Sequence, residues 1–212
     1  MRSKILFPLF FISMLIGQSS FTEHVITTSA SYAYSVYAAD VDSDGDMDVL
    51  SASFMDDKIA WYENDGSENF TEHVISTSAD NTRCVHAADV DGDGDMDVLS
   101  ASGGDDKIAW YENDGSENFT EHAISTSADG ARSVHVVDVD GDGDMDVLSA
   151  SSGDDKIAWY ENNGSESFTE HAISTSADYA HSVYAVDVDG DGDMDVLSGS
   201  SEDYKFAWYE ND

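Results

Sequence analysis

The stretch Asp138-Val-Asp-Gly-Asp-Gly-Asp-Met-Asp-Val-Leu148 decides the fold of this chain. Near-copies of it begin at Asp40, Asp89 and Asp187, so each copy starts 49 residues after the one before. All four tryptophans keep the same interval. Self-similarity with a period of about 20–50 residues is typical of repeat proteins, in which each repeat is one supersecondary unit. The sequence therefore predicts four consecutive units in one domain that covers residues 21–212.

Each unit contains short segments with the composition of β-strands. In the third unit these segments cover residues 133–137, 145–150, 156–160 and 168–173. The first is β-branched, the third is aromatic and apolar, and the fourth alternates between apolar and polar residues. Glu161-Asn-Asn-Gly164 is a strong turn signal between the last two segments. No stretch keeps a helical spacing, so the chain is expected to be all-β.

Four short strands in each repeat of roughly 40–50 residues are typical of a β-propeller blade. The chain starts with a segment equivalent to the fourth, outermost strand d (residues 21–26) and ends with one equivalent to strand c (residues 205–210). Pairing of this N-terminal strand d with the C-terminal strand c would close a ring of four 49-residue blades. The alternative is that the chain forms part of a larger ring completed by another copy.

Every unit carries the pattern Asp-x-Asp-x-Asp-Gly-x-x-Asp between its first two strands. The spacing turns alternate carboxylates inward, and the glycine permits the sharp bend that wraps a loop around an ion. Positions 1, 3, 5 and 9 are expected to supply side chains, and position 7 its backbone carbonyl. These positions are Asp40, Asp42, Asp44, Asp46 and Asp48; Asp89, Asp91, Asp93, Asp95 and Asp97; Asp138, Asp140, Asp142, Asp144 and Asp146; and Asp187, Asp189, Asp191, Asp193 and Asp195.

Hard oxygen ligands on a flexible loop favour Ca²⁺ over Mg²⁺, and one ion in each repeat gives about four in the chain. Solvated acidic turns are the simpler interpretation, but five carboxylates within nine residues would repel one another strongly unless a cation neutralised them. An EF-hand is excluded because its twelfth position needs a glutamate, and Ser51 stands there in the first loop.

The loop Asp138–Asp146 followed by Val147-Leu-Ser-Ala150 resembles the FG-GAP/VCBS repeats of integrin-α-like β-propellers. The resemblance covers residues 21–212. It implies that the loop joins strands a and b of a blade and binds calcium through the positions named above. Two features depart from the family: the Phe-Gly and Gly-Ala-Pro signatures are absent, and family rings commonly have seven blades.

The charge balance limits the partners of this chain. Forty-five acidic residues against eight basic ones give a formal net charge of −37, which argues against binding to nucleic acid or anionic lipid. Residues 1–20 have a basic start, a short apolar run and small residues at the end, which predict a signal peptide and hence a secreted or cell-surface protein without membrane insertion. A single cysteine excludes an internal disulfide, so bound calcium is the expected stabiliser.

Differences among the four repeats indicate where a partner would bind. They cluster before the first strand and in the b–c turn, on the face opposite the aspartate loops. Aromatic, arginine and histidine side chains there suit sugars or acidic peptides. The candidates are Tyr34, Arg83, Arg132, Tyr179 and His181. The expected function is adhesion or recognition of a protein or glycan by a monomeric ring; a polysaccharide lyase or hydrolase and a surface-layer segment are the alternatives.

Overall fold

The computed structural model describes residues 21–211, so the predicted signal peptide lies outside the described residues. Within this range the chain forms four antiparallel sheets, each with its strands in sequence order. No helix there is long and apolar enough to cross a bilayer. The first sheet contains β1 (Ala33–Ala39), β2 (Asp48–Ser53), β3 (Lys58–Asn64) and β4 (Phe70–Ser76), and the second contains β5 (Thr82–Ala88), β6 (Asp97–Ser102), β7 (Lys107–Asn113) and β8 (Phe119–Ser125). The third contains β9 (Ala131–Val137), β10 (Asp146–Ser151), β11 (Lys156–Asn162) and β12 (Phe168–Ser174), and the fourth contains β13 (Ala180–Val186), β14 (Asp195–Ser200) and β15 (Lys205–Tyr209).

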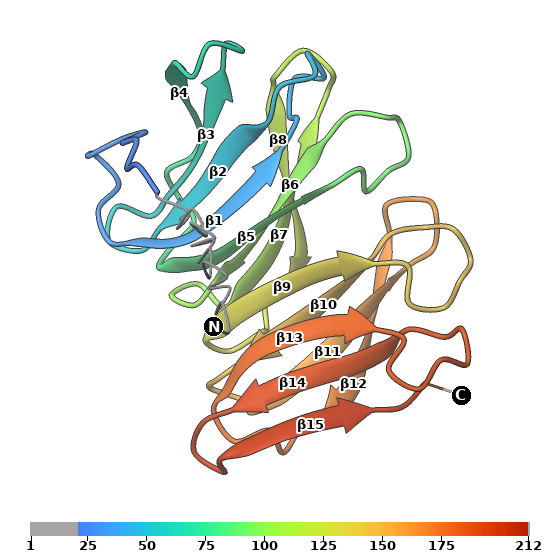
Figure 1. Ribbon diagram of the computed structural model, residues 1–212. Helices are drawn as coiled ribbons and strands as arrows, with labels where there is room; N and C mark the ends of the chain where they lie inside the picture. The colour runs from blue at the N-terminus through green and yellow to red at the C-terminus, as the bar shows by residue number, and fades with distance from the viewer. Residues whose placement is uncertain (1–20, 212) are drawn as a thin grey trace, which may run out of the picture.

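The strands predicted from the repeat are confirmed except the one at residues 21–26, with one sheet for each 49-residue unit. The sheets follow one another in sequence order along an arc, with β1–β4 at one end and β13–β15 at the other (Figure 1). The first strands of neighbouring sheets contact one another, β1 with β5, β5 with β9 and β9 with β13. These four strands therefore lie on the inner side of the arc.

Apolar side chains from two consecutive sheets form each part of the core. Leu50, Ile59 and Trp61 of the first sheet pack with Val85 and Tyr111 of the second. The same positions recur between the second and third sheets and between the third and fourth. Successive side chains of a strand point to opposite faces of its sheet. One set of apolar side chains therefore packs on the following sheet, and the other set packs on the preceding sheet.

An asparagine side chain ties each sheet to the preceding one. Asn113 Nδ2 lies 3.3 Å from the carbonyl oxygen of Val41, in the aspartate loop of the first sheet. Asn162 makes the same contact with Val90 at 3.2 Å, and Asn211 with Val139 at 3.2 Å. These bonds connect the ends of the third strands to the preceding loops and fix how consecutive sheets sit on one another.

The predicted ring closure does not occur in this structure. Residues 21–26 form no strand, and the fourth sheet has three strands, so the expected pairing of strand d with strand c is not confirmed for residues 21–211. The physical reason is that the first and fourth sheets lie at opposite ends of the arc (Figure 1), and a strand forms only against an available edge. Residues 23–28 instead line a groove of about 360 Å³ together with Val36, Val49 and Tyr62.

Candidate metal centres

The aspartate loops connect the first and second strands of every sheet, as the sequence predicts. In the first sheet the loop runs from Asp40, just after β1, to Asp48, the first residue of β2. Gly45, at the sixth position, has φ of 99°, in the left-handed region that favours glycine. The equivalent glycines of the other loops have φ between 98° and 108°. The backbone therefore turns back on itself where the repeat pattern requires it.

The ninth-position aspartate is the anchor of each loop. Asp48 is fully buried. Its Oδ2 accepts a hydrogen bond from the backbone N–H of Val41 at 3.0 Å, and its Oδ1 accepts one from the backbone N–H of Asn64 at 2.8 Å. Asp97, Asp146 and Asp195 are also buried and accept the equivalent pairs of bonds. This carboxylate holds the loop against the start of β2 and the end of β3.

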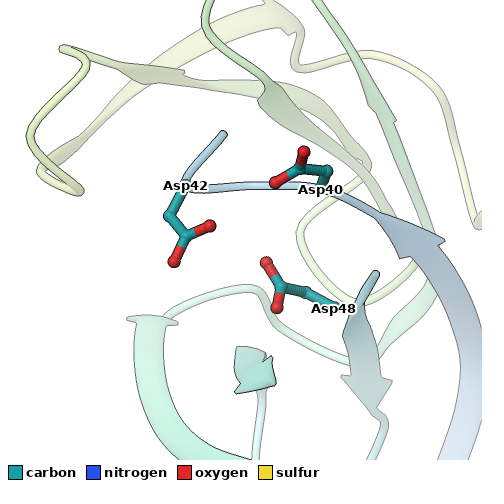
Figure 2. Close-up of side chains that lie close together, drawn as sticks. All are labelled: Asp40, Asp42 and Asp48. Carbon is teal, nitrogen blue, oxygen red and sulfur yellow. The ribbon is translucent and has the colours of Figure 1, made fainter. Parts of the chain in front are cut away.

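Three carboxylates converge in each loop. Oxygens of Asp40, Asp42 and Asp48 lie within 4.8 Å of one another, and their side chains point toward a common space (Figure 2). Asp40 Oδ1 is buried and has no hydrogen-bond partner among the described residues, which leaves it available to a cation. The other loops gather the same positions: Asp89, Asp91 and Asp97; Asp138, Asp140 and Asp146; and Asp187, Asp189 and Asp195.

Positions 5 and 7 lie outside these groups of three. Asp44 is exposed, and its Oδ1 accepts a hydrogen bond from the backbone N–H of Asp46 at 2.9 Å. The Asp46 carboxylate lies against Gly66 in the β3–β4 turn, where an added Cβ would collide with it. Asp93, Asp142 and Asp191 accept the same bond as Asp44, and Asp95 and Asp144 lie against the equivalent glycines. The side chain of position 7 thus turns away from the convergent group.

Burial and mutual repulsion disfavour the charged form of several loop carboxylates. Burial raises the pKa of Asp97 to about 6. Burial, and then the charges of its neighbours, also raise the pKa of Asp42 and of Asp91. A cation placed among these oxygens would offset both effects. A set made of carboxylate oxygens fits a hard cation such as calcium, and the described residues place no cysteine or histidine in these groups.

Sequence reasoning missed the asparagine at the end of each third strand. The backbone N–H of Asn64 donates a hydrogen bond to Asp48, which fixes the position of Asn64. Asn113 makes the same bond to Asp97. The signal was present in the sequence, since Trp-Tyr-Glu-Asn recurs at the 49-residue interval. The asparagines support the loops from behind and are not part of the convergent groups.

Four of the five residues predicted for a ligand-binding face lie on inner strands, Tyr34 on β1, Arg83 on β5, Arg132 on β9 and His181 on β13, and Tyr179 directly precedes β13. The Arg132 guanidinium lies over the Tyr179 ring, 4.3 Å from its centroid, and donates a hydrogen bond to the Tyr179 hydroxyl. Arg132 Nη1 is 3.5 Å from His181 Nε2. The structure therefore brings Arg132, Tyr179 and His181 together.

Tyr34 and Arg83 extend this cluster through a residue that the prediction did not include. Arg83 lies 5.4 Å from the centroid of the Phe54 ring, and the Tyr34 ring is 5.8 Å from the same ring. Burial, and then the positive charge of Arg132, lower the pKa of Arg83. β1 has seven residues, and at about 3.3 Å per residue its two ends are roughly 20 Å apart. This face therefore lies at the opposite end of the inner strands from the aspartate loops.

Two solved structures are similar to this chain. An Agrocybe aegerita lectin, described as recognising non-reducing terminal N-acetylglucosamine, shares the fold with a TM-score of 0.56 and 20% identity over 80% of this chain and 48% of its own. An exo-β-1,3-galactanase from Clostridium thermocellum matches with a TM-score of 0.47 and 14% identity over 82% of this chain and 45% of its own. The chain thus spans about half the length of these proteins. No curated protein sequence matches it.

Family comparison addresses the repeat itself. The FG-GAP-like repeat matches three times, at residues 40–100, 89–149 and 138–198. Each match begins at the first aspartate of a loop and extends into the next repeat. The matches together cover most of the chain and all four aspartate loops. The chain therefore belongs to the FG-GAP-like repeat family.

Proposed function

We propose that this chain is a calcium-binding module that recognises carbohydrate. The observation that carries the calcium part is the convergence of three carboxylates in every loop, with a buried Asp40 oxygen that lacks a hydrogen-bond partner within residues 21–211. In the first loop Asp40, Asp42 and Asp48 hold the ion, Asp44 contributes its side chain, and Asp46 contributes its carbonyl. The other three loops use the equivalent residues.

Bound calcium stabilises the folded chain. A ligand that binds only the folded state contributes about 2.7 kcal/mol when its concentration is 100 times its Kd. Extracellular calcium modules bind at roughly 10⁻⁴–10⁻³ M, so each site contributes less than this at millimolar calcium. Four sites together still add a sizeable part of the roughly 5–15 kcal/mol that stabilises a typical domain.

Calorimetric titration and thermal melting test the calcium sites. We expect about four ions per chain and a higher melting temperature in millimolar calcium than in chelator. Asp140→Ala, which deletes a carboxylate of the convergent group, should remove one of these ions, whereas Asp114→Ala is a matched control because Asp114 lies in an exposed turn outside the loops. Equal melting temperatures with and without calcium would disprove the stabilising role.

The carbohydrate part rests on the face that contains Arg83, Arg132, Tyr179 and His181. Aromatic rings supply stacking surface for a sugar, and the guanidinium groups supply hydrogen-bond donors for hydroxyls or carboxylates. Arg132 Nε and Arg83 Nε have no hydrogen-bond partner among the described residues. The likeness to a glycan-binding lectin supports a carbohydrate over a protein ligand.

A glycan array that includes acidic oligosaccharides, probed in calcium and in chelator, tests this part. We expect binding that Arg132→Ala weakens by at least tenfold and Asp114→Asn leaves unchanged. Binding that is insensitive to Arg132→Ala would move the ligand site elsewhere. Release of shorter sugars from a bound glycan would instead show an enzyme, such as a lyase or hydrolase, at this face.

We also propose that the protein is exported, on the basis of the composition of residues 1–20. Mass spectrometry of protein recovered from the culture medium should show a mature chain that begins close to residue 21. Retention of the intact N-terminus inside the cell would contradict export. Adhesion would then need a ligand on a surface that the protein can reach.

A further inference from the structure

We propose that copies of this chain associate head to tail. The open face of the fourth sheet of one copy packs on the first sheet of the next copy, and residues 21–26 of that next copy add a strand to β15. The contact would repeat most of the interface that already joins consecutive sheets within the chain, except the bond from a backbone N–H to an aspartate that Tyr204 replaces. This inference concerns assembly and does not depend on calcium or carbohydrate binding.

The first observation is an exposed apolar surface at the end of the arc. We call the side of a sheet that packs on the following sheet its front face. In the first sheet, Ile59 and Trp61 on this face are both 0% exposed. The equivalent residues of the fourth sheet are Phe206, which is 94% exposed, and Trp208, which is 45% exposed. Among residues 21–211, no sheet covers this apolar face of the fourth sheet.

The opposite end of the arc presents the matching surface. We call the side that packs on the preceding sheet the rear face. Val85, Val134 and Val183 on the rear faces of the later sheets are 2%, 3% and 6% exposed. The equivalent residue of the first sheet, Val36, is 70% exposed. Front and rear faces pack together three times within the chain. The front face of the fourth sheet and the rear face of the first sheet are the two that remain exposed.

The sequence of residues 21–26 supplies the strand that the fourth sheet lacks. These residues read Phe-Thr-Glu-His-Val-Ile, identical to residues 70–75 of β4. β4 pairs antiparallel with β3, with His73 opposite Trp61. Phe21 is 98% exposed and Val25 is 65% exposed. The segment carries a strand sequence without a sheet, while β15 is a strand whose outer edge is unpaired in the described sheets.

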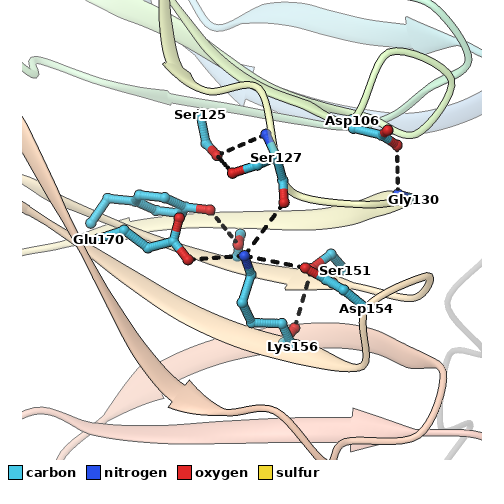
Figure 3. Close-up of polar contacts among 10 residues, drawn as sticks. Asp106, Ser125, Ser127, Gly130, Ser151, Asp154, Lys156 and Glu170 are labelled. Carbon is cyan, nitrogen blue, oxygen red and sulfur yellow. Dashed lines mark hydrogen bonds and ion pairs between the residues drawn. The ribbon is translucent and has the colours of Figure 1, made fainter.

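The ion pairs of the lysine at the start of each third strand also indicate that residues 21–26 of another copy pair with β15. Lys156 Nζ lies 2.9 Å from Glu170 on β12, 3.2 Å from Asp154 and 3.4 Å from the carbonyl oxygen of Ser127 (Figure 3). The equivalent Lys205 is 2.7 Å from Asp203, but its side chain is 51% exposed. The residue equivalent to Glu170 is Glu23, in the segment that would pair with β15.

The asparagine contact between sheets is also complete except at the ends. Asn113, Asn162 and Asn211 each donate to a loop carbonyl of the preceding sheet. By the same register, Asn64 of one copy would donate to the carbonyl of Val188 in the copy before it. Head-to-tail packing therefore reproduces the apolar contact, the strand pairing, the ion pair and the asparagine bond together.

Three substitutions distinguish the open end of the fourth sheet from the corresponding part of the earlier sheets. Phe206 replaces the isoleucine of the earlier repeats, and Gly199, which lies opposite it, replaces their alanine. The earlier repeats have an aspartate at the position of Tyr204. One of these aspartates, Asp106, accepts a hydrogen bond from the backbone N–H of Gly130 in the next repeat (Figure 3). These changes add aromatic surface to the open end, which increases the apolar area that a second copy would bury.

A second copy is a better occupant than the same chain because the two open faces lie at opposite ends of the arc (Figure 1). Head-to-tail contacts form a closed ring when the rotation between copies closes. An uncovered edge strand such as β15 is also a template for pairing with another chain. Two arcs joined at both ends would leave neither an open face nor an open edge.

An engineered disulfide tests the pairing directly. In β3 and β4, Ala60 lies opposite Val74, so Ala207 of one copy should lie opposite Val25 of the next. The variant Val25→Cys/Ala207→Cys, made in the full chain with Cys84→Ser, is oxidised and run on a non-reducing gel. The matched control, Ala60→Cys/Val74→Cys, should form a disulfide within one chain.

The proposal predicts a covalent species with at least twice the mass of the chain. A disulfide within a single chain would overturn it, because the ring would then close on itself. Absence of the disulfide when the control pair oxidises would also overturn it.

A charge reversal, made in the chain that retains Cys84, tests the same interface independently by measuring self-association. Lys205→Glu should raise the dissociation constant for self-association at least tenfold in sedimentation velocity. Adding Glu23→Lys should restore association, since the pair is then reversed. A monomeric wild-type chain at all concentrations, or no rescue by the second substitution, would contradict the proposed interface.

Discussion

Replacing the ninth-position aspartate should destabilise the fold even without calcium. Asp97 is fully buried, and its carboxylate accepts the backbone N–H of Val90 at 3.0 Å and that of Asn113 at 2.8 Å. Asp97→Ala leaves both donors without an acceptor. Each buried unsatisfied group costs about 1–3 kcal/mol, so the free energy of unfolding should fall by about 2–6 kcal/mol. This is a large part of the roughly 5–15 kcal/mol of a typical domain.

Asp93→Ala in the same loop is the matched control. The Asp93 side chain is exposed, and the one backbone N–H that it accepts, from Asp95 at 2.9 Å, can be hydrated by water instead. In chelator its free energy of unfolding should stay within about 0.5 kcal/mol of wild type, as for most surface substitutions. In calcium it should lose part of the stabilisation that the ion provides. The two variants thus separate the structural role of the loop from its metal-binding role.

Urea unfolding followed by tryptophan fluorescence, at neutral pH, measures both effects. Each variant is compared with wild type in chelator and again in millimolar calcium. If Asp97→Ala were as stable as wild type in chelator, the two backbone bonds would not support the loop. If Asp93→Ala were as destabilised there as Asp97→Ala, the distinction between buried and exposed carboxylates would be wrong.

Three further predictions concern titration and packing. The pKa of Asp97 in the folded chain is about 6, above its unfolded value of 3.8, so in chelator the part of its contribution that comes from protonation is complete below pH 3.8 and is lost as pH rises through 6, while its backbone hydrogen bonds remain; a stability difference between wild type and Asp97→Asn that does not change with pH over this range would contradict this. His86 should stay neutral at pH 6 in an NMR titration, because burial and the nearby His135 lower its pKa to about 4, whereas a midpoint near 6.5 would show that it is exposed. Trp110→Ala should cost about 3–5 kcal/mol because the side chain is 1% exposed, and Trp208→Ala, at 45% exposure, should cost less than half as much in dilute, separated chains; equal costs in urea unfolding would contradict the packing.

The sequence predicted the strands and the metal loops because both depend on local patterns. Alternation of apolar and polar residues set the strands of the third sheet to within about two residues of the structure. The spacing of the aspartates and the glycine at position 6 predicted the loop conformation. The partial convergence was not predicted: Asp40, Asp42 and Asp48 meet, while the side chain at position 7 turns toward the β3–β4 turn. That orientation depends on the register of β2 against β3, which local spacing does not determine.

Ring closure could not be predicted because it depends on rotations between sheets. Each rotation is set by packing such as that of Trp61 against the second sheet and by single bonds such as Asn113 to Val41. Small rotations add along the arc, so the position of the last sheet relative to the first is a property of all the interfaces together. The period of the repeat gives the number of sheets and leaves the curvature undetermined.

The string Phe-Thr-Glu-His-Val-Ile shows what local sequence leaves open. It forms a strand at residues 70–75 and no strand at residues 21–26, although the residues are identical. The difference is the presence of β3 beside the first and the absence of a sheet edge beside the second. Strand formation is therefore decided here by the neighbour, and the same argument applies to the faces, since Val85 is buried while Val36 is exposed for want of a preceding sheet. The first sheet thus has the same strand pattern as the later sheets and differs from them in that, among the described residues, no sheet covers its rear face.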